Sequence, residues 1–180
     1  MSDTIKIHNV VASCAADAKI PLSRLAMELE GTEYEPEQFP GLVLRLTDPK
    51  AAALIFNTGK IVCTGTKSPE QAKQAVANIV EKIKSLGIDV TSTNELTIQN
   101  IVASASVGAE LNLNQIAFQL EGTEYEPEQF PGLVYRLDGP KTVFLLFSSG
   151  KVICTGGKSE GEVRDSVEKL KGNLRRINAI

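Results

Sequence analysis

A 14-residue string, EGTEYEPEQFPGLV, occurs twice in this chain without a mismatch, beginning at Glu30 and again at Glu121. The offset of 91 residues never slips: of the 85 residue pairs that it defines between Ile5 and Ile180, 37 are identical, which is too many for chance. Two copies are too few for a solenoid, which needs about three repeats to bury a continuous core. The sequence therefore predicts one pseudo-twofold body made of a first repeat at 1–91 and a second repeat at 92–180.

Each copy predicts the same order of elements, namely a strand, a short helix, several strands and a long helix. In the first copy the expected strands are 5–13, 42–46, 51–56 and 60–64, with a short helix at 21–29, a long helix from residue 68 and a linker at 87–95. Asn57-Thr58-Gly59 is typical of a three-residue hairpin loop, with glycine where a positive φ is needed. Ser68, with Pro69 and Gln71 after it, is typical of a capped helix start. Hairpins and helices together predict an α+β fold.

The predicted strands carry apolar side chains at both odd and even positions, so both faces of the sheet are partly apolar. The long helix has a single apolar stripe and can cover one face only. The set that suits the helix side is Val10, Ala12, Ile55, Ile61 and Cys63. The alternate set mixes apolar groups with polar tips and cations, and consists of Asn9, Val11, Arg45, Leu54, Phe56, Lys60, Val62 and Thr64. A face of this kind, left without a helix, is a candidate binding site.

The composition is that of an ordinary globular protein. With 42% hydrophobic residues, 23% charged residues and a formal net charge of -3, the 180-residue chain is neither collagen-like nor disordered nor a coiled coil. No apolar run approaches the roughly 18 residues of a membrane span, and the N-terminus lacks the regions of a signal peptide, so a cytoplasmic protein is expected. Cys14, Cys63 and Cys154 form no CxxC pair and predict buried hydrophobic residues rather than a disulfide or a zinc site.

The sequence offers little to an enzyme. His8 is the only histidine, aligns with Gln99 and is expected to be an exposed strand residue, and the HExxH and GxGxxG motifs are absent. The segment 156–159, GGKS, resembles the end of a phosphate-binding loop, but the first glycine of that motif would fall at Val152. We therefore expect no catalytic residue, no cofactor and no metal.

Several motifs, present in both copies, together resemble the TATA-box-binding protein family. They are N-[VI]-V in the first strand, EYEPEQFPGL, then LIF or LLF, and GK-[IV]-x-CTG followed by K-S at a helix start. The resemblance covers essentially the whole chain, and the short N-terminus and acidic balance are similar to archaeal members. It implies a ten-stranded antiparallel saddle-shaped sheet with four helices on the convex face and the DNA minor groove on the concave face.

The resemblance also implies a function. It is that of a general transcription factor that binds A·T-rich promoter DNA, acts at the nucleoid of an archaeal cell and assembles with transcription factor B and the RNA polymerase preinitiation complex. Kinking of the duplex by inserted wedges is a property for which this family is itself the standard example, so it comes from the resemblance alone.

The resemblance assigns roles to matched positions of the two copies. The groove-facing contacts match Asn9, Val11, Leu54, Val62 and Thr64, and Asn100, Val102, Leu145, Ile153 and Thr155. The intercalating phenylalanine pairs match Phe39 with Phe56 and Phe130 with Phe147. The phosphate contacts match Arg45, Lys60 and Lys67, and Arg136, Lys151 and Lys158. The loop formed by the duplicated string is the stirrup, and in the second copy Glu124, Glu126 and Glu128 match the acidic residues that bind transcription factor B.

The residues themselves are consistent with these roles, but an alternative stays open. Each phenylalanine taken singly is more often a core residue than a wedge, and its recurrence on the face without a helix is what favours the wedge. Lysines after hairpin glycines are often merely solvated, and the glutamate-rich strings are also typical of a solvated loop. The alternative is a duplicated protein-interaction or small-ligand-binding module of the same shape.

Overall fold

The protein is described from a computed structural model, and the description covers residues 4–90 and 96–180. The expected linker at 87–95 lies partly outside these residues. The elements of the first copy are β1 (Lys6–Ala15), α1 (Leu22–Glu28), β2 (Thr32–Glu33), β3 (Leu42–Thr47), β4 (Lys50–Ile55), β5 (Lys60–Thr66) and α2 (Pro69–Ser85). Those of the second copy are β6 (Thr97–Ser106), α3 (Leu113–Gln119), β7 (Thr123–Glu124), β8 (Leu133–Arg136), β9 (Val143–Leu146), β10 (Lys151–Gly157) and α4 (Glu160–Arg176).

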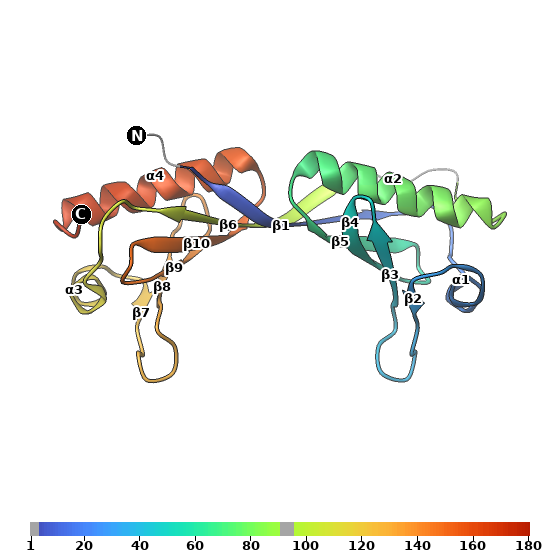
Figure 1. Ribbon diagram of the computed structural model, residues 1–180, viewed down its shortest axis with the longest axis horizontal. Coiled ribbons are helices and arrows are strands. Elements are labelled where there is room, and N and C mark those ends of the chain that lie inside the picture. Colours follow the sequence, from blue (N-terminus) through green and yellow to red (C-terminus); the bar gives the residue numbers. More distant parts are fainter. Residues whose placement is uncertain (1–3, 91–95) are drawn as a thin grey trace. The chain divides into compact units, whose positions relative to one another are not determined.

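The described strands form a ten-stranded antiparallel sheet in the order β2-β3-β4-β5-β1-β6-β10-β9-β8-β7, accompanied by four helices (Figure 1). The two halves of this order mirror each other because the two copies fold alike. The predicted α+β class, the tandem repeats, the ten strands and the four helices are confirmed. The saddle shape of the sheet stays a prediction.

Contacts along the chain divide it into two compact units. One is Asn9–Gln99, called here the first half, and the other is Asn100–Ile180 with the described residues up to His8, called the second half. The start of β1 therefore groups with the second copy and the start of β6 with the first. The repeat boundary predicted at 91/92 describes the sequence duplication and stays a prediction for the domains.

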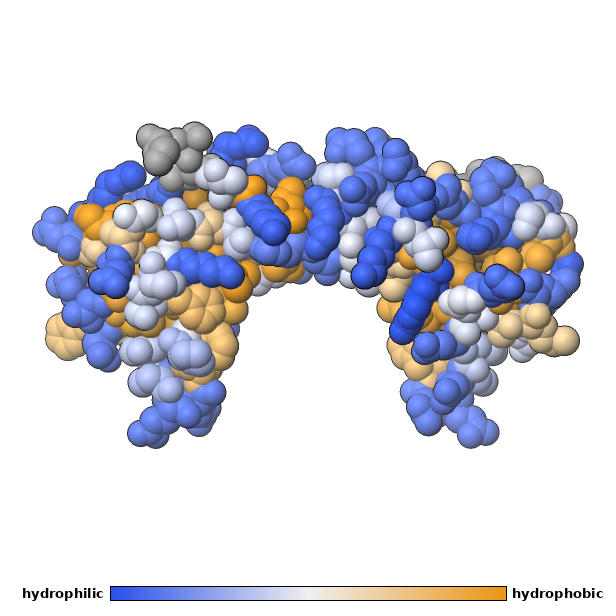
Figure 2. Space-filling view, in the orientation of Figure 1, coloured by the Kyte–Doolittle hydropathy of each residue, from blue (hydrophilic) through white to orange (hydrophobic). Residues whose placement is uncertain are grey.

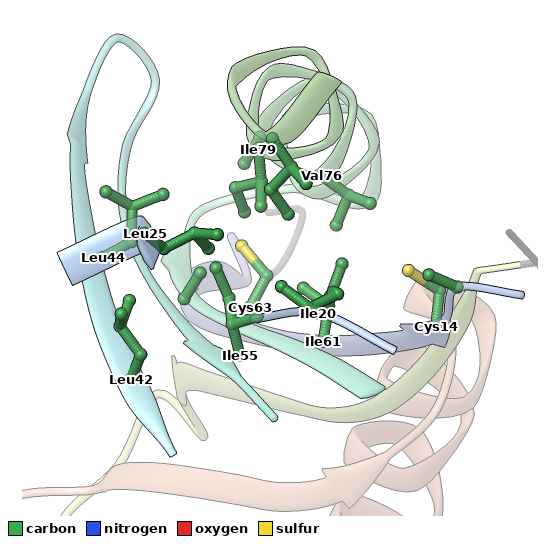
Figure 3. Close-up of a cluster of buried hydrophobic side chains, with 14 of the residues drawn as sticks. Cys14, Ile20, Leu25, Leu42, Leu44, Ile55, Ile61, Cys63, Val76 and Ile79 are labelled. Atoms are coloured by element: carbon green, nitrogen blue, oxygen red, sulfur yellow. The ribbon is translucent and has the colours of Figure 1, made fainter. Parts of the chain in front are cut away.

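The core of the first half lies between α2 and the sheet. Figure 3 shows Val76 and Ile79 of α2 pointing toward Ile20, Ile61 and Cys63, and all five side chains are buried. Val76 and Ile79 come from the single stripe of the helix, Ile61 and Cys63 from alternate positions of β5, and Ile20 from the segment between β1 and α1. The contact between helix stripe and strand is the packing that the apolar periodicity predicts. The second half buries the corresponding stripe of α4, made of Val163, Val167, Leu170 and Leu174.

The long helices begin where the sequence predicts. The Ser68 hydroxyl accepts a hydrogen bond from the backbone N–H of Gln71 at 3.1 Å, and the Gln71 side-chain oxygen accepts one from the N–H of Lys67, also at 3.1 Å. Ser159 accepts from the N–H of Glu162 in the same way. These bonds satisfy donors that the first turn of a helix leaves unpaired.

Three local features differ from or extend the sequence predictions. Pro21 precedes α1 as its N-cap instead of lying inside it. The strands β2 and β7 have two residues each, which is too short for any periodicity to show, and the residue pattern did not predict them. Gly59 has the expected positive φ of 103°, and a side chain there would also collide with the Ala16 carbonyl oxygen, 2.7 Å from the position of a Cβ.

Candidate nucleic-acid interface

Alternate residues of the strands in the first half leave one sheet face without a covering helix. Leu44, Ala53 and Cys63 have no exposed surface, whereas their neighbours on the opposite face remain partly accessible. Those neighbours pair across the strands in two rows, Val43–Leu54–Val62 and Arg45–Ala52–Thr64. The partition between a helix side and an open side that the sequence predicted is therefore what the structure contains.

The second half repeats this arrangement. Its two rows are Val134–Leu145–Ile153 and Arg136–Val143–Thr155, and every member is partly or largely exposed. Val11 and Val102 lie partly buried on β1 and β6. The rows include four residues that the sequence analysis did not single out, Val43, Ala52, Val134 and Val143. The alternation of side chains along β3, β4, β8 and β9 was the signal that could have found them.

An asparagine on the first strand of each copy is held by a bulge in the neighbouring strand. The register between β1 and β5 shifts between Val10 and Ala12, and Gly65 there has a φ of 97°. The Asn9 side-chain oxygen accepts from the Gly65 N–H at 2.6 Å, and its amide nitrogen donates to the Thr64 hydroxyl at 3.0 Å. Asn100 makes the same bonds to Gly156 and Thr155, at 2.6 and 3.1 Å.

These bonds fix which way each amide points. The glycine N–H occupies the amide oxygen, so the NH₂ group is the end left to donate to Thr64 or Thr155, and at most one of its two donors is used there. The threonine hydroxyl also lies 3.2 or 3.4 Å from the same amide oxygen. The asparagine and threonine of each half thus form a small polar group with a spare donor, beside the apolar members of the rows. The sequence identified both members, and the structure adds the glycine that orients them.

The phenylalanines form two matched pairs, in which Phe56 and Phe147 directly follow β4 and β9. The ring centroids of Phe39 and Phe56 are 5.8 Å apart with an interplanar angle of 68°, and those of Phe130 and Phe147 are 5.9 Å apart at 70°. Phe39 and Phe130 each keep 40% of their surface exposed. Edge-to-face contacts stabilise such pairs, yet neither pair is enclosed in a core.

A glycine in each stirrup makes room for these rings. A Cβ at Gly41 would lie 2.7 Å from the Phe39 ring and 3.0 Å from the Phe56 ring, and Gly132 stands in the same relation to Phe130 and Phe147. The PG dipeptide of the duplicated string thus serves a close approach of two aromatic rings to the backbone, a role that the sequence analysis did not assign.

The cations expected at phosphates lie at the exposed edge of the open faces. Arg45 pairs with Glu33 at 3.5 Å and Arg136 with Glu124 at 3.1 Å, and all four side chains are more than half exposed. Exposed pairs of this kind contribute about 0–1 kcal/mol and exchange readily for another anion. The other four, Lys60, Lys67, Lys151 and Lys158, are exposed.

The stirrup of the second half projects from β7 and β8, and Figure 2 shows that its end is hydrophilic. Glu124, Glu126 and Glu128 are exposed. The carbonyl oxygen of Glu126 accepts from the N–H groups of Gln129 and Phe130, at 2.9 and 3.0 Å, so the loop is folded into a turn. The structure thus separates the three: Glu124 already pairs with Arg136, whereas Glu126 and Glu128 form no salt bridge within residues 4–90 and 96–180.

His8 is a correction to the sequence analysis. It was expected to be simply exposed, but it is half-buried, and its Nε2 lies 2.6 Å from the Ser104 hydroxyl oxygen. The matched Gln99 donates to the Ser13 hydroxyl at 2.8 Å. Both contacts join residues more than 80 positions apart, which no local pattern can indicate.

Two further properties of the structure concern other kinds of site. Among residues 4–90 and 96–180, no group of three or more histidine, cysteine, aspartate or glutamate side chains could hold a metal ion. Over the same part of the chain, no helix is both long enough and apolar enough to cross a membrane.

The fold and the site together define a duplicated binding protein whose open sheet faces carry apolar rows, oriented amides and exposed phenylalanine pairs. Residues 4–86 and 95–177 each match the family described as "Transcription factor TFIID (or TATA-binding protein, TBP)". The chain belongs to this family. Its members are transcription factors and not enzymes.

Relatives match over nearly the whole chain. The TATA-box-binding protein of Archaeoglobus fulgidus is 55% identical over 175 residues, with 96% of each chain covered. That of Methanocaldococcus jannaschii is 53% identical over 180 residues, covering 100% of this chain and 98% of the relative. The solved structure of the Methanococcus jannaschii TBP has a TM-score of 0.89 and 54% identity, covering 96% of this chain and 98% of that one.

Proposed function

We propose that the chain is an archaeal general transcription factor that binds the minor groove of A·T-rich TATA elements, bends the DNA by phenylalanine insertion and nucleates the preinitiation complex. The observation that carries the proposal is the open face of each half, which combines apolar rows with one oriented asparagine-threonine group and one exposed arginine. Family membership and the names of its relatives support the promoter element as the target.

The chemistry of the open face favours A·T over G·C. In the minor groove, A·T pairs present only acceptors, whereas a G·C pair adds the amino donor of guanine N2. The spare amide donors of Asn9 and Asn100 suit acceptors, and rows such as Val43–Leu54–Val62 offer a guanine amino group no partner. Burying that donor unpaired costs about 1–3 kcal/mol, so selection comes from rejecting G·C.

The phenylalanine pairs suit the role of wedges. Apolar side chains inserted between base steps unstack them and kink the duplex toward the major groove, and this family is itself the standard example of such binding. The ring of Phe39 or Phe130 is partly exposed and packs edge-to-face against Phe56 or Phe147. Flexible TA steps lower the cost of the deformation.

The cations at the edge of each open face provide the electrostatic part of binding. The ion pairs of Arg45 and Arg136 with glutamates are exposed, so a phosphate can displace the carboxylate at little cost. The chain's net charge of -3 does not oppose this role, because the exposed acidic residues of the duplicated string lie in the stirrups.

The acidic stirrup of the second half suits a protein partner. We infer that Glu124, Glu126 and Glu128 bind transcription factor B, which in turn recruits RNA polymerase, and that the protein works at the nucleoid. Family resemblance supports this partner, and the exposure of the three glutamates in a folded turn is consistent with it.

The test compares three duplexes of the same length in a mobility-shift titration. One carries an A·T-rich element, the second carries G·C pairs at its centre, and the third carries inosine·cytosine pairs there. Inosine lacks the N2 amino group, so the proposal expects the third duplex to bind nearly as well as the first and the second to bind at least tenfold more weakly. Equal binding to all three, or none, would favour the alternative of a duplicated protein- or ligand-binding module.

A further inference from the structure

The two halves differ in charge beside the lysine that precedes each long helix. In the first half, Gln71 accepts the N–H of Lys67 through a neutral amide oxygen; in the second half, the carboxylate of Glu162 accepts the N–H of Lys158, both at 3.1 Å. One turn further along, Gln74 of the first half is replaced by Asp165 in the second. The hydrogen bond has the same length in both halves, so Gln71 and Glu162, which have side chains of the same shape, differ mainly in charge.

A pocket in the first half shows which groups these glutamines face. It has a volume of about 770 Å³ and opens beside Thr64 and Gly65 of the candidate interface. Three cations line it, Arg45, Lys50 and Lys67, together with Asp48, Gln71 and Gln74. Positions 71 and 74 therefore share one surface with the side chains expected to meet DNA phosphates.

The matched positions of the second half carry three cations and two carboxylates. The cations are Arg136, Lys141 and Lys158, the carboxylates are Glu162 and Asp165, and Gly139 stands where the first half has Asp48. Glu162 accepts from the backbone N–H of Lys158, so its carboxylate lies within about one lysine side-chain length of the phosphate that the Lys158 ammonium is expected to meet. A like charge near a bound phosphate weakens its binding, most strongly at low salt.

Resting on the proposed function, we propose that the first half grips the DNA backbone more strongly than the second, and that Gln71 and Gln74 against Glu162 and Asp165 set this difference. The groove-facing residues of the two halves are nearly the same and give no direction. The side chains expected to meet phosphates give the free protein a modest preference for one orientation. The half with the neutral glutamines binds preferentially at the more negatively charged flank of an element.

The experiment uses a palindromic A·T-rich duplex whose phosphates on one flank are replaced by neutral methylphosphonates. Glu37 lies in the first stirrup and is exposed, and the three native cysteines are buried. A Glu37→Cys protein therefore accepts a DNA-cleaving iron chelate at one place. The side on which the DNA is cut reports where the first half sits.

The expected result is a two- to fivefold excess of complexes, on the order of one exposed charge contact, with the first half on the charged flank at low salt. The Glu162→Gln/Asp165→Gln variant should lose the excess or show a slight excess of the opposite orientation, because Asp48 then remains as the one carboxylate of the two matched sets. Adding Gln71→Glu/Gln74→Asp to this variant exchanges the neutral and acidic side chains between the two halves and should reverse the preference. Each side chain is one that the other half already uses, so the helix caps are kept, and thermal unfolding checks this.

Glu168→Gln is the matched control, because it removes an exposed carboxylate of α4 that lies farther along the helix from Lys158. It should leave the preference unchanged. Equal cutting on both sides by the starting protein, or a preference that survives the exchange, would overturn the inference while leaving DNA binding intact. Failure to bind the unmodified A·T-rich duplex would overturn the proposed function itself, and this inference with it.

Discussion

At the scale of single residues, position on the sheet decides what a side chain does. Phe144 of β9 is fully buried, whereas Phe147, three residues later, belongs to an exposed edge-to-face pair. The three cysteines lie on the helix side, where burial raises the pKa of Cys63 and of Cys154 to about 11. Residue type alone does not separate the two phenylalanines; their positions along the strand do.

Removing the second phenylalanine of a pair, Phe56 or Phe147, should impair DNA binding. We expect Phe56→Ala or Phe147→Ala to weaken A·T-rich binding by about 1–3 kcal/mol and to reduce the bend, because the wedge loses its support. Fluorescence transfer between the ends of a short duplex measures the bend. Phe118→Ala is the control: this ring is 91% exposed on α3, outside the open face, and its loss should change neither quantity. An undiminished bend in folded Phe56→Ala or Phe147→Ala protein contradicts the wedge assignment.

The buried thiols should make the free energy of unfolding depend on pH in the alkaline range. The pKa of the Cys63 thiol rises from 9.0 to about 11, first through desolvation and second through Cys14. Because the fold keeps the thiol protonated, its contribution is fully present below pH 9 and is lost as the pH rises to about 11. We expect wild-type protein to lose stability relative to Cys63→Ala across this interval, as measured by urea unfolding. A difference between the two proteins that stays constant from pH 8 to 11 would show that the thiol is not desolvated.

At the scale of elements, the stirrup and the strands beside it act as one unit. The β2–β3 and β7–β8 pairs carry the arginine-glutamate contacts, and the PG dipeptide that ends each stirrup lets the aromatic rings approach the backbone. The duplicated string thus includes a turn, exposed glutamates, a phenylalanine that is proposed as a wedge, and a glycine that the rings approach closely.

A methyl group at the stirrup glycine should disturb the wedge without unfolding the protein. Gly41 has no positive φ, so the Gly41→Ala backbone is unstrained, but its Cβ would force the two rings to move. We expect the affinity for DNA to fall at least tenfold, with little change in the melting temperature. Gly172→Ala, in α4 with nothing within 4 Å of the new Cβ, should keep DNA binding and gain up to about 1 kcal/mol of stability. Normal binding by Gly41→Ala would mean that the observed ring positions are not needed.

Arg45 of β3 should contribute to the salt dependence of DNA binding. Six phosphate contacts give a slope of about -5 in a plot of log affinity against log salt, and Arg45→Ala should reduce its magnitude by about one. Glu33→Gln removes the partner of Arg45, and we expect the slope to persist while affinity rises by a factor below about five. A slope near zero in the wild-type protein would instead favour the alternative module.

At the scale of the whole molecule, duplication makes the DNA-facing residues nearly symmetric and places the differences elsewhere. The asparagine-threonine groups and phenylalanine pairs match between halves to within 0.1 Å in the distances quoted above. The long helices differ: exposed Ala77 and Asn78 stand where the second copy has exposed Glu168 and Lys169. If the proposed function holds, we expect strict direction on a promoter to come from a partner protein, because the inferred bias of the free protein is modest.

Charge reversal in the second stirrup should abolish partner binding without impairing DNA binding. We expect Glu126→Arg to prevent the ternary complex with transcription factor B and DNA, because an acidic contact becomes repulsive, while binding to A·T-rich DNA stays intact or improves slightly. A supershift titration measures both. Glu35→Arg is the same change in the identical string of the first stirrup and should leave the ternary complex intact. A normal complex with Glu126→Arg, or strict orientation by the protein alone, contradicts this division of labour.

The sequence by itself determined the duplication, the order of the main elements and the partition of the strands into two faces, because identical strings reveal a repeat directly and apolar alternation is a local pattern that burial enforces. Only the tertiary structure decided which atoms meet across the sheet. Asn9 is oriented by a bulge 56 positions away, His8 meets Ser104, and Arg45 pairs with Glu33. Such contacts depend on strand register and on where a bulge interrupts it, and a one-residue shift would move every partner, so no window of sequence contains them.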